Sequence, residues 1–159
     1  MKQIKTQDLD AKLPQIIFLS SATLNPAFSA GRSKIFHWII HNAFRHVYDD
    51  IDLAEEIFEN EKELVSVTYV TPGALIEAEE GKGWKLSLTH HSGLVTYPDL
   101  AGAMVGVVEE SGYEGRKVGI VGVEEGVSVP LTLPLSVLQG LVWTFCPWLW
   151  RASRSLGLK

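Results

Sequence analysis

The sequence predicts an α/β fold with a partial parallel sheet, flanking helices and an apolar C-terminal helix. Short apolar runs alternate with segments whose apolar residues recur at helical spacing, a pattern typical of this class. The first continuous apolar run, 15–20, stops at two serines, as a buried parallel strand does at its carboxyl end. The chain has 159 residues, 46% of them hydrophobic and 21% charged, which is enough for one domain with a buried core.

Three further segments have the patterns of strands. The run at 65–70 is rich in β-forming residues and ends at a Thr-Pro-Gly turn, and the run at 117–123 supplies a last strand. Alternation of apolar and polar residues over 84–88 predicts a half-buried strand.

Helical spacing predicts the segments between these strands. Ser33 is placed to cap a helix whose apolar residues lie over 35–44, and a second helix with an acidic face is expected over about 50–62. Pro98 occupies a favourable first-turn position of a third helix, and Gly112 lies beyond its end.

The tail differs in composition from the rest. Residues 130–150 carry no charge and are followed by Arg151 and Arg154, the outline of a membrane segment with basic residues beyond it. Prolines and a glycine interrupt this segment. A spanning helix, an interfacial or re-entrant anchor, and a helix packed back on the domain therefore stay open. We expect an α/β domain over 1–129 and an apolar, membrane-associating tail over 130–159.

Charge and cysteine content exclude several classes of protein. The net charge of −5 argues against a nucleic-acid-binding surface. The single cysteine, Cys146, excludes an intrachain disulfide and a zinc site built from several thiolates. No apolar run follows the first lysines, so we expect no signal peptide and an intracellular, cytoplasmic protein.

Three motifs carry a family resemblance. FLSSAT at 18–23, TYVTPGAL at 68–75 and GLVTYPDLAGAMVGVV at 93–108 resemble, in this order, the NmrA-like atypical short-chain dehydrogenases. The tail ending in PWLW is similar to the averufin-oxidase-like branch of fungi. The resemblance implies a Rossmann fold that binds NAD(P), and chemistry on aromatic polyketides in secondary metabolism.

Only the carboxyl half of that fold is recognisable. A glycine-rich strand-to-helix turn, which holds the cofactor pyrophosphate on helix amides, should precede the 64–108 block, and nothing like it does. We therefore expect NAD(P)H binding to need another chain.

The resemblance also implies site residues. Ser20 and Ser21 match the strand end where a hydroxyl can hydrogen-bond a carbonyl that is being reduced, although serines there also satisfy loop backbone groups. Thr71, Pro72 and Gly73 match the loop beside the nicotinamide, and an ordinary turn is the alternative.

The usual acid–base pair of short-chain dehydrogenases is broken. In that pair a lysine lies four residues after the catalytic tyrosine, and its ammonium favours the ionised phenol. The best-placed tyrosine here is Tyr48, and Asp52 stands four residues on. Tyr48 is thus a candidate catalytic residue, with a packing role as the alternative. Asp99 matches a family position at a helix start, where we expect a structural carboxylate.

Two other patterns are weak. VGIVGVEEG at 118–126 lacks the second and third glycines of a dinucleotide-binding turn. His37 and His41 have a spacing that suits zinc but lack a third ligand, so we expect no metal. His90 and His91 could border a polar pocket.

The sequence therefore favours an oxidoreductase-like protein that acts on or binds a small aromatic polyketide. A non-catalytic accessory protein with a protein partner or a homo-oligomeric state, and a truncated remnant, are the alternatives. Enzymatic activity stays undecided at this point, because the glycine-rich turn and the Tyr-Lys pair are both missing.

Overall fold

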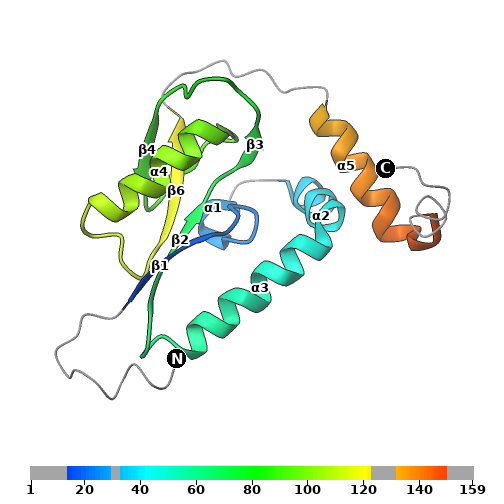
Figure 1. Ribbon diagram of the computed structural model, residues 1–159. Coiled ribbons are helices and arrows are strands. Elements are labelled where there is room, and N and C mark those ends of the chain that lie inside the picture. The colour runs from blue at the N-terminus through cyan, green and yellow to red at the C-terminus, as the bar shows by residue number, and fades with distance from the viewer. Residues whose placement is uncertain (1–13, 30–32, 123–131, 150–159) are drawn as a thin grey trace.

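The α/β architecture expected from the sequence is confirmed. A computed structural model describes residues 14–29, 33–122 and 132–149 (Figure 1). The main sheet has the strand order β1-β2-β6-β4, in which β4 is antiparallel to β6 and the other pairs are parallel. These strands are β1 (Gln15–Leu19), β2 (Ser66–Thr71), β6 (Lys117–Gly122) and β4 (Trp84–Ser87). Two short parallel strands, β3 (Ala74–Ile76) and β5 (Leu94–Thr96), form a second sheet.

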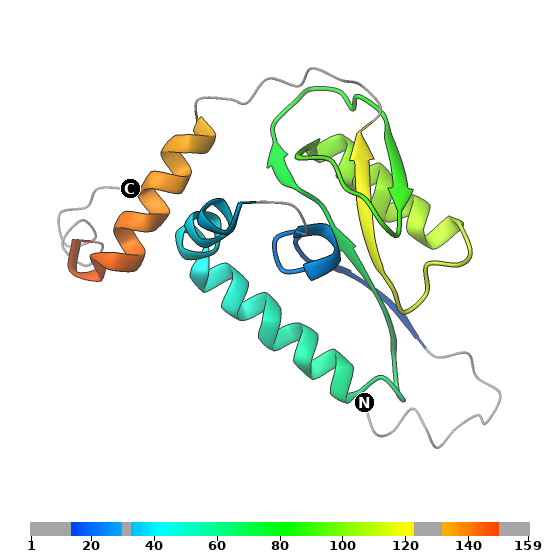
Figure 2. The ribbon, with the colours of Figure 1, turned by 180° about the vertical axis from the view of Figure 1, so that it is seen from behind.

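Five helices accompany the strands in the described part of the chain. They are α1 (Pro26–Ser29), α2 (Lys34–Ala43), α3 (Arg45–Asn60), α4 (Tyr97–Glu109) and α5 (Thr132–Phe145). α3 and α4 lie on opposite sides of the main sheet (Figures 1 and 2).

Each face of the sheet has its own apolar cluster, because successive side chains of a strand point to opposite faces. On the α4 side, Val70, Val118 and Ile120 are fully buried against Leu100 and Val107 of the helix. On the α3 side, a second cluster contains three buried side chains: Val67 and Tyr69 of β2, and Val65, which directly precedes the strand. Phe18 and Phe58 pack against this cluster.

Two glycines of α4 pack against the indole ring of Trp84 in β4. A Cβ added at Gly102 or Gly106 would overlap ring atoms of Trp84. The missing side chains thus form a shallow groove on the helix, and Trp84 fills it. This contact fixes the antiparallel edge strand against α4.

α5 packs against α2 and lies away from the sheet (Figure 2). A Cβ at Gly140 would overlap the carbonyl oxygen of Ala43, and the Thr144 hydroxyl donates to the Asn42 carbonyl oxygen at 2.8 Å. Within the described residues, no helix has the length and apolar character needed to cross a bilayer. The expected boundary between 129 and 130 lies outside the described residues.

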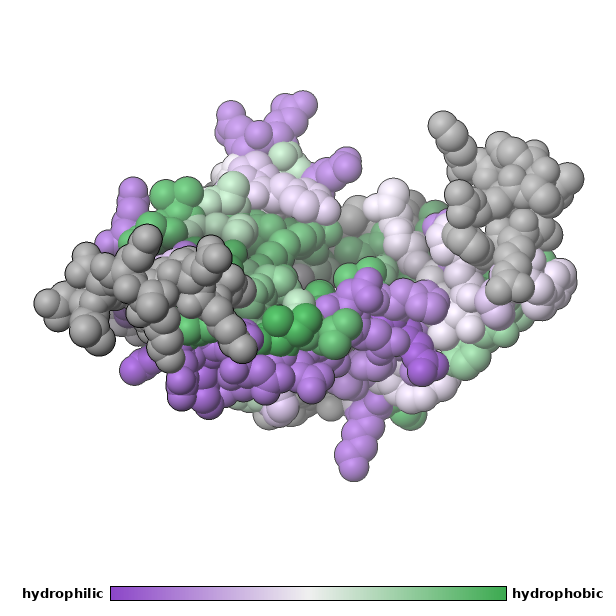
Figure 3. All heavy atoms as spheres, turned by 60° about the horizontal axis from the view of Figure 1, so that its bottom comes forward, coloured by the Kyte–Doolittle hydropathy of each residue, from purple (hydrophilic) through white to green (hydrophobic). Residues whose placement is uncertain are grey.

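Local details differ from the sequence-based expectations. α3 begins at Arg45 rather than near residue 50, since it follows α2 with only Phe44 between them. β3 and β5 were not predicted, because three residues are too few to show a period. Ser33 precedes α2 as expected but makes no side-chain capping bond. The exposed face of α3 is acidic, as predicted, and hydrophilic side chains gather beside an apolar area in Figure 3.

Removing the Trp84 ring should destabilise the domain strongly. Trp84→Ala is expected to lower the free energy of unfolding by about 3 kcal/mol, because the groove on α4 is left empty. Trp38 is 55% exposed, and Trp38→Ala is the matched control, with an expected loss below about 1 kcal/mol. Urea unfolding followed by circular dichroism measures both. Equal losses in the two variants would contradict this account of Trp84.

Candidate functional site

The two loops singled out in the sequence lie side by side at the carboxyl ends of β1 and β2. The Ser20 amide donates to the Val70 carbonyl oxygen at 2.8 Å, and the Ala22 amide donates to the Pro72 carbonyl oxygen at 2.9 Å. The parallel ladder thus continues past the end of β1. The structure brings Ser20 and Ser21 next to the turn that begins at Thr71.

Ser20 belongs to a buried hydrogen-bond chain. Ser20 is 5% exposed, and its hydroxyl donates to Oε1 of Glu55 on α3 at 2.6 Å. The other carboxylate oxygen, Oε2, accepts from Nζ of Lys117 at 2.6 Å. The Ser20 proton is therefore directed at Glu55, while its lone pairs can still accept a hydrogen bond.

Tyr69 lies beneath this chain. Nζ of Lys117 is 5.5 Å from the centre of its ring, within the range of a cation–π contact. Burial raises the pKa of Tyr69, and the carboxylates of Glu55 and Glu59 raise it further. The phenol is therefore kept neutral, and Tyr69 belongs to the apolar cluster on the α3 side of the sheet.

Ser21 and Tyr48 each have local partners. Oγ of Ser21 accepts from the Thr23 amide at 3.2 Å, which stabilises the turn after β1. Tyr48 is buried on α3, with its ring 5.7 Å from that of His41 and 6.2 Å from that of Phe44. These contacts agree with the structural alternatives for both residues. Their catalytic roles stay predictions.

The Thr-Pro-Gly turn is held from two sides. The buried Thr71 hydroxyl donates to the Val118 carbonyl oxygen at 2.9 Å. A Cβ at Gly73 would overlap the carbonyl oxygens of Ser92 and Gly93, and the Ala74 amide donates to the latter at 2.8 Å. Gly73 is therefore needed for a backbone crossing. That Thr71, Pro72 and Gly73 contact a cofactor stays a prediction.

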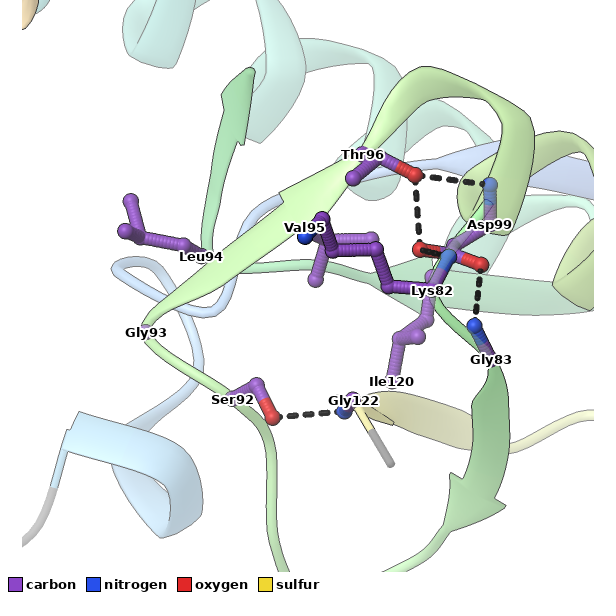
Figure 4. A pocket seen from close by; sticks show the side chains of 10 residues that line it. All are labelled: Lys82, Gly83, Ser92, Gly93, Leu94, Val95, Thr96, Asp99, Ile120 and Gly122. Carbon is purple, nitrogen blue, oxygen red and sulfur yellow. Dashed lines mark hydrogen bonds between the residues drawn. The ribbon is translucent and has the colours of Figure 1, made fainter. Parts of the chain in front are cut away.

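A cavity of about 290 Å³ lies beyond the same crossing (Figure 4). Apolar side chains of β5 and β6 form part of its wall, and polar groups come from Lys82, Ser92 and Asp99. Oγ of Ser92 accepts from the Gly122 amide at 2.6 Å, so this serine joins the loop before β5 to the end of β6. The sequence indicated neither the cavity nor the role of Ser92, because the lining residues come from four separate segments.

Asp99 organises the wall of this cavity. Its carboxylate accepts from the Thr96 hydroxyl at 2.6 Å and from the amides of Lys82 and Gly83 at 3.0 Å each. Burial acts to raise the pKa of Asp99, but the hydrogen bonds from Thr96, Lys82 and Gly83 outweigh it and lower the pKa below its usual value. Thr96 also caps α4 by accepting from the Asp99 amide. Asp99 thus has the structural role that the sequence favoured.

The histidines hold loops in place. The rings of His37 and His41 are stacked with centroids 6.1 Å apart, and Nε2 of His37 is 3.1 Å from the Thr23 carbonyl oxygen. Nε2 of His91 lies 3.2 Å from the Phe28 carbonyl oxygen of α1. Among the residues that the structure describes, no three His, Cys, Asp or Glu side chains are grouped to hold a metal ion. The 118–126 segment forms β6 in its first part, and its remainder lies outside the described residues.

Replacing Asp99 should show how much its hydrogen bonds contribute to the free energy of unfolding. Asp99→Asn is expected to lower the free energy of unfolding at neutral pH by about 1–3 kcal/mol, since an amide nitrogen would face one donor. The folded-state pKa of Asp99 is depressed, so its stabilisation is present above about pH 4 and is lost as the pH falls through the folded-state value. Urea titrations over that range should show the difference between wild type and variant shrinking on acidification. A difference independent of pH would argue against an ionised Asp99.

A methyl group at Gly73 should disrupt the crossing. Gly73→Ala is expected to cost about 1–3 kcal/mol, because backbone atoms must move to admit the Cβ. Gly93 is the matched control, since a Cβ there meets nothing within 4 Å. Thermal unfolding should show a lowered midpoint for Gly73→Ala and little change for Gly93→Ala. Similar midpoints for both variants would disprove the crossing constraint.

Comparison with known proteins points to one class. No protein-family model matches the chain. An oxidoreductase of Pestalotiopsis microspora is 32% identical over 94% of this chain and 57% of its own length. Oxidoreductase stcQ of Emericella nidulans is 29% identical over 95% of this chain and 56% of its own. Oxidoreductase aflX of Aspergillus parasiticus is 31% identical over 87% of this chain and 53% of its own length.

Among solved structures, a short-chain dehydrogenase/reductase of Veillonella parvula in complex with NADP matches 74% of this chain and 55% of its own, with a TM-score of 0.47 and 12% identity. The chain spans about half the length of the curated relatives it matches. Over most of its own length, the chain is thus similar to one part of a group of fungal oxidoreductases.

Proposed function

We propose that this chain is the substrate-side part of an NAD(P)H-dependent oxidoreductase of fungal secondary metabolism. The proposed relationship is to the NmrA-like short-chain dehydrogenases and, within them, the averufin-oxidase-like branch. The proposed substrate is an aromatic polyketide intermediate. Similarity to proteins named oxidoreductases from several fungi supports the reaction class.

One observation carries the proposal furthest. The loop with Ser20 and Ser21 is hydrogen-bonded to the turn with Pro72, and both lie at the carboxyl ends of neighbouring parallel strands. Ligands of open α/β sheets bind outside this edge. Two of the three pieces of sequence that resemble the family thus meet at this edge of the sheet.

The described residues do not supply the phosphate-binding site of a nicotinamide cofactor. None of the strand-to-helix turns in the described ranges has the glycine spacing that places a pyrophosphate on helix amides. β2 is the only hydrogen-bonded neighbour of β1 in the described residues, so the sheet has room for further parallel strands there. The proposal therefore assigns the cofactor phosphates to polypeptide beyond the matched region.

Within this proposal, Ser20 orients the substrate. Its hydroxyl donates a hydrogen bond to Glu55, so the oxygen accepts a hydrogen bond from a substrate hydroxyl, while donation to a carbonyl requires a rotation away from Glu55. The ion pair with Lys117 keeps the Glu55 carboxylate in place. This chain contributes orientation, and the reducing equivalent comes from the cofactor.

A second candidate is a non-catalytic binding protein. The Ser20 hydroxyl and the Tyr48 ring are both engaged in internal contacts, which favours a packed, inactive edge. Such a protein would retain a small-molecule or protein partner without turnover.

Complementation separates the two candidates. The chain alone is expected not to enhance NADPH fluorescence at millimolar cofactor. Mixed with the part of Emericella nidulans stcQ that lies outside the matched region, it should bind NADPH, because under this proposal that part supplies the phosphate-binding turn. That part of stcQ alone is the control. A mixed complex that forms on gel filtration yet never binds NADPH would refute the oxidoreductase proposal and favour the binding protein.

A further inference from the structure

We propose that the α2–α5 pair is a membrane-docking surface, which lies in the plane of an anionic bilayer and holds the domain against it. The inference is independent of the proposed reaction. It rests on the apolar character of both helices, on the position of their aromatic residues, and on the charges around them.

α5 is apolar on both of its long faces. One face carries Leu133, Val137 and Leu141, which recur at helical spacing and are half-buried, and α5 as a whole packs against α2. The opposite face carries Leu135 and Leu138, which are 64% and 59% exposed. A helix of a soluble domain normally has a polar outer face, and an apolar one needs a cover.

α2 also carries exposed apolar side chains. Its side chains Ile35, Phe36 and Trp38 are 72%, 48% and 55% exposed, although each is large and apolar. The described residues of the pair include no carboxylate, and the acidic side chains gather on α3 instead. An apolar surface free of acidic groups suits an anionic lipid surface better than a protein interface, which normally has a polar rim.

The aromatic residues gather at one end of the pair. The ring of Trp38 stacks on Phe145 with centroids 6.0 Å apart, and the Asn42 carbonyl oxygen accepts from the Thr144 hydroxyl, so α2 meets the C-terminal end of α5. Trp148, which is 65% exposed, follows this end of α5 in the sequence. Tryptophan is enriched where lipid tails meet headgroups.

The sequence has a basic residue at the start of α2 and two more shortly after α5. Lys34 is the first residue of α2, and the sequence continues after Leu149 with Arg151 and Arg154. Cations beside an apolar surface add attraction to anionic lipids. α5 has 14 residues, or about 21 Å of helix, which is shorter than the hydrocarbon core of about 30 Å. The geometry thus favours a helix in the membrane plane.

Vesicle sedimentation tests the proposal with the full chain. The protein should sediment with vesicles of phosphatidylcholine and phosphatidylserine, and more weakly with phosphatidylcholine alone. Leu138→Ser with Trp148→Ser should reduce binding at least about ten-fold, because both side chains are exposed and would enter the lipid. Arg151→Gln and Arg154→Gln should each weaken binding to the anionic vesicles about five-fold and leave binding to neutral vesicles unchanged.

The control is an equally exposed apolar pair on another helix. Val105→Ser with Val108→Ser on α4, where the wild-type residues are 56% and 61% exposed, should leave sedimentation unchanged. Circular dichroism should show the same helix content in all variants. Absence of sedimentation with either vesicle, or equal losses in the α4 and α5 variants, would overturn the proposal. So would a dimer seen by light scattering that Leu138→Ser with Trp148→Ser abolishes while vesicle binding is absent, since a second copy would then cover this surface.

Discussion

Burial of β2 on both faces is the constraint from which the other contacts follow. Val70 points to the α4 side and Tyr69 to the α3 side, so neither helix can move without exposing an apolar side chain of this strand. β2 also pairs with β1 and β6, which aligns the carboxyl ends of three strands. The candidate site is located at this edge because the strand is central, and the Gly73 crossing is the direct continuation of β2.

The chain from Lys117 through Glu55 to Ser20 connects folding with function. Glu55 has a partly buried carboxylate that both neighbours satisfy, and an unpaired partner there would be costly. The same arrangement decides which hydrogen bonds Ser20 has left for a ligand. In the proposed function, stability and ligand recognition therefore compete for one hydroxyl group, and a substrate must offer a donor or compensate for the bond to Glu55.

Much of the fold was predictable from local patterns. The apolar run before Ser20 and the proline of α4 predicted their elements, because both signals lie within a few residues. The contact of Glu55 with Lys117 joins residues 62 apart in the sequence, and no local pattern indicates such a pair. The contact between Trp84 and the glycine groove on α4 was not predicted for the same reason. Ser20 and the Thr71–Gly73 turn lie at the strand ends that the sequence predicted, whereas the cavity near Asp99 depends on a crossing visible only in three dimensions.

In the part of the chain that the structure describes, β1 is an edge strand, and this has a consequence for handling the protein. β1 has the sequence QIIFL, with no proline and no charged residue, and Leu19 is 38% exposed. Proteins usually blunt such an edge with lysine, proline or a bulge, because an unblocked strand acts as a template for intermolecular sheet formation. β1 has none of these features. Aggregation during expression should therefore begin at this strand, and its solubility should improve once the edge is covered by a neighbouring strand.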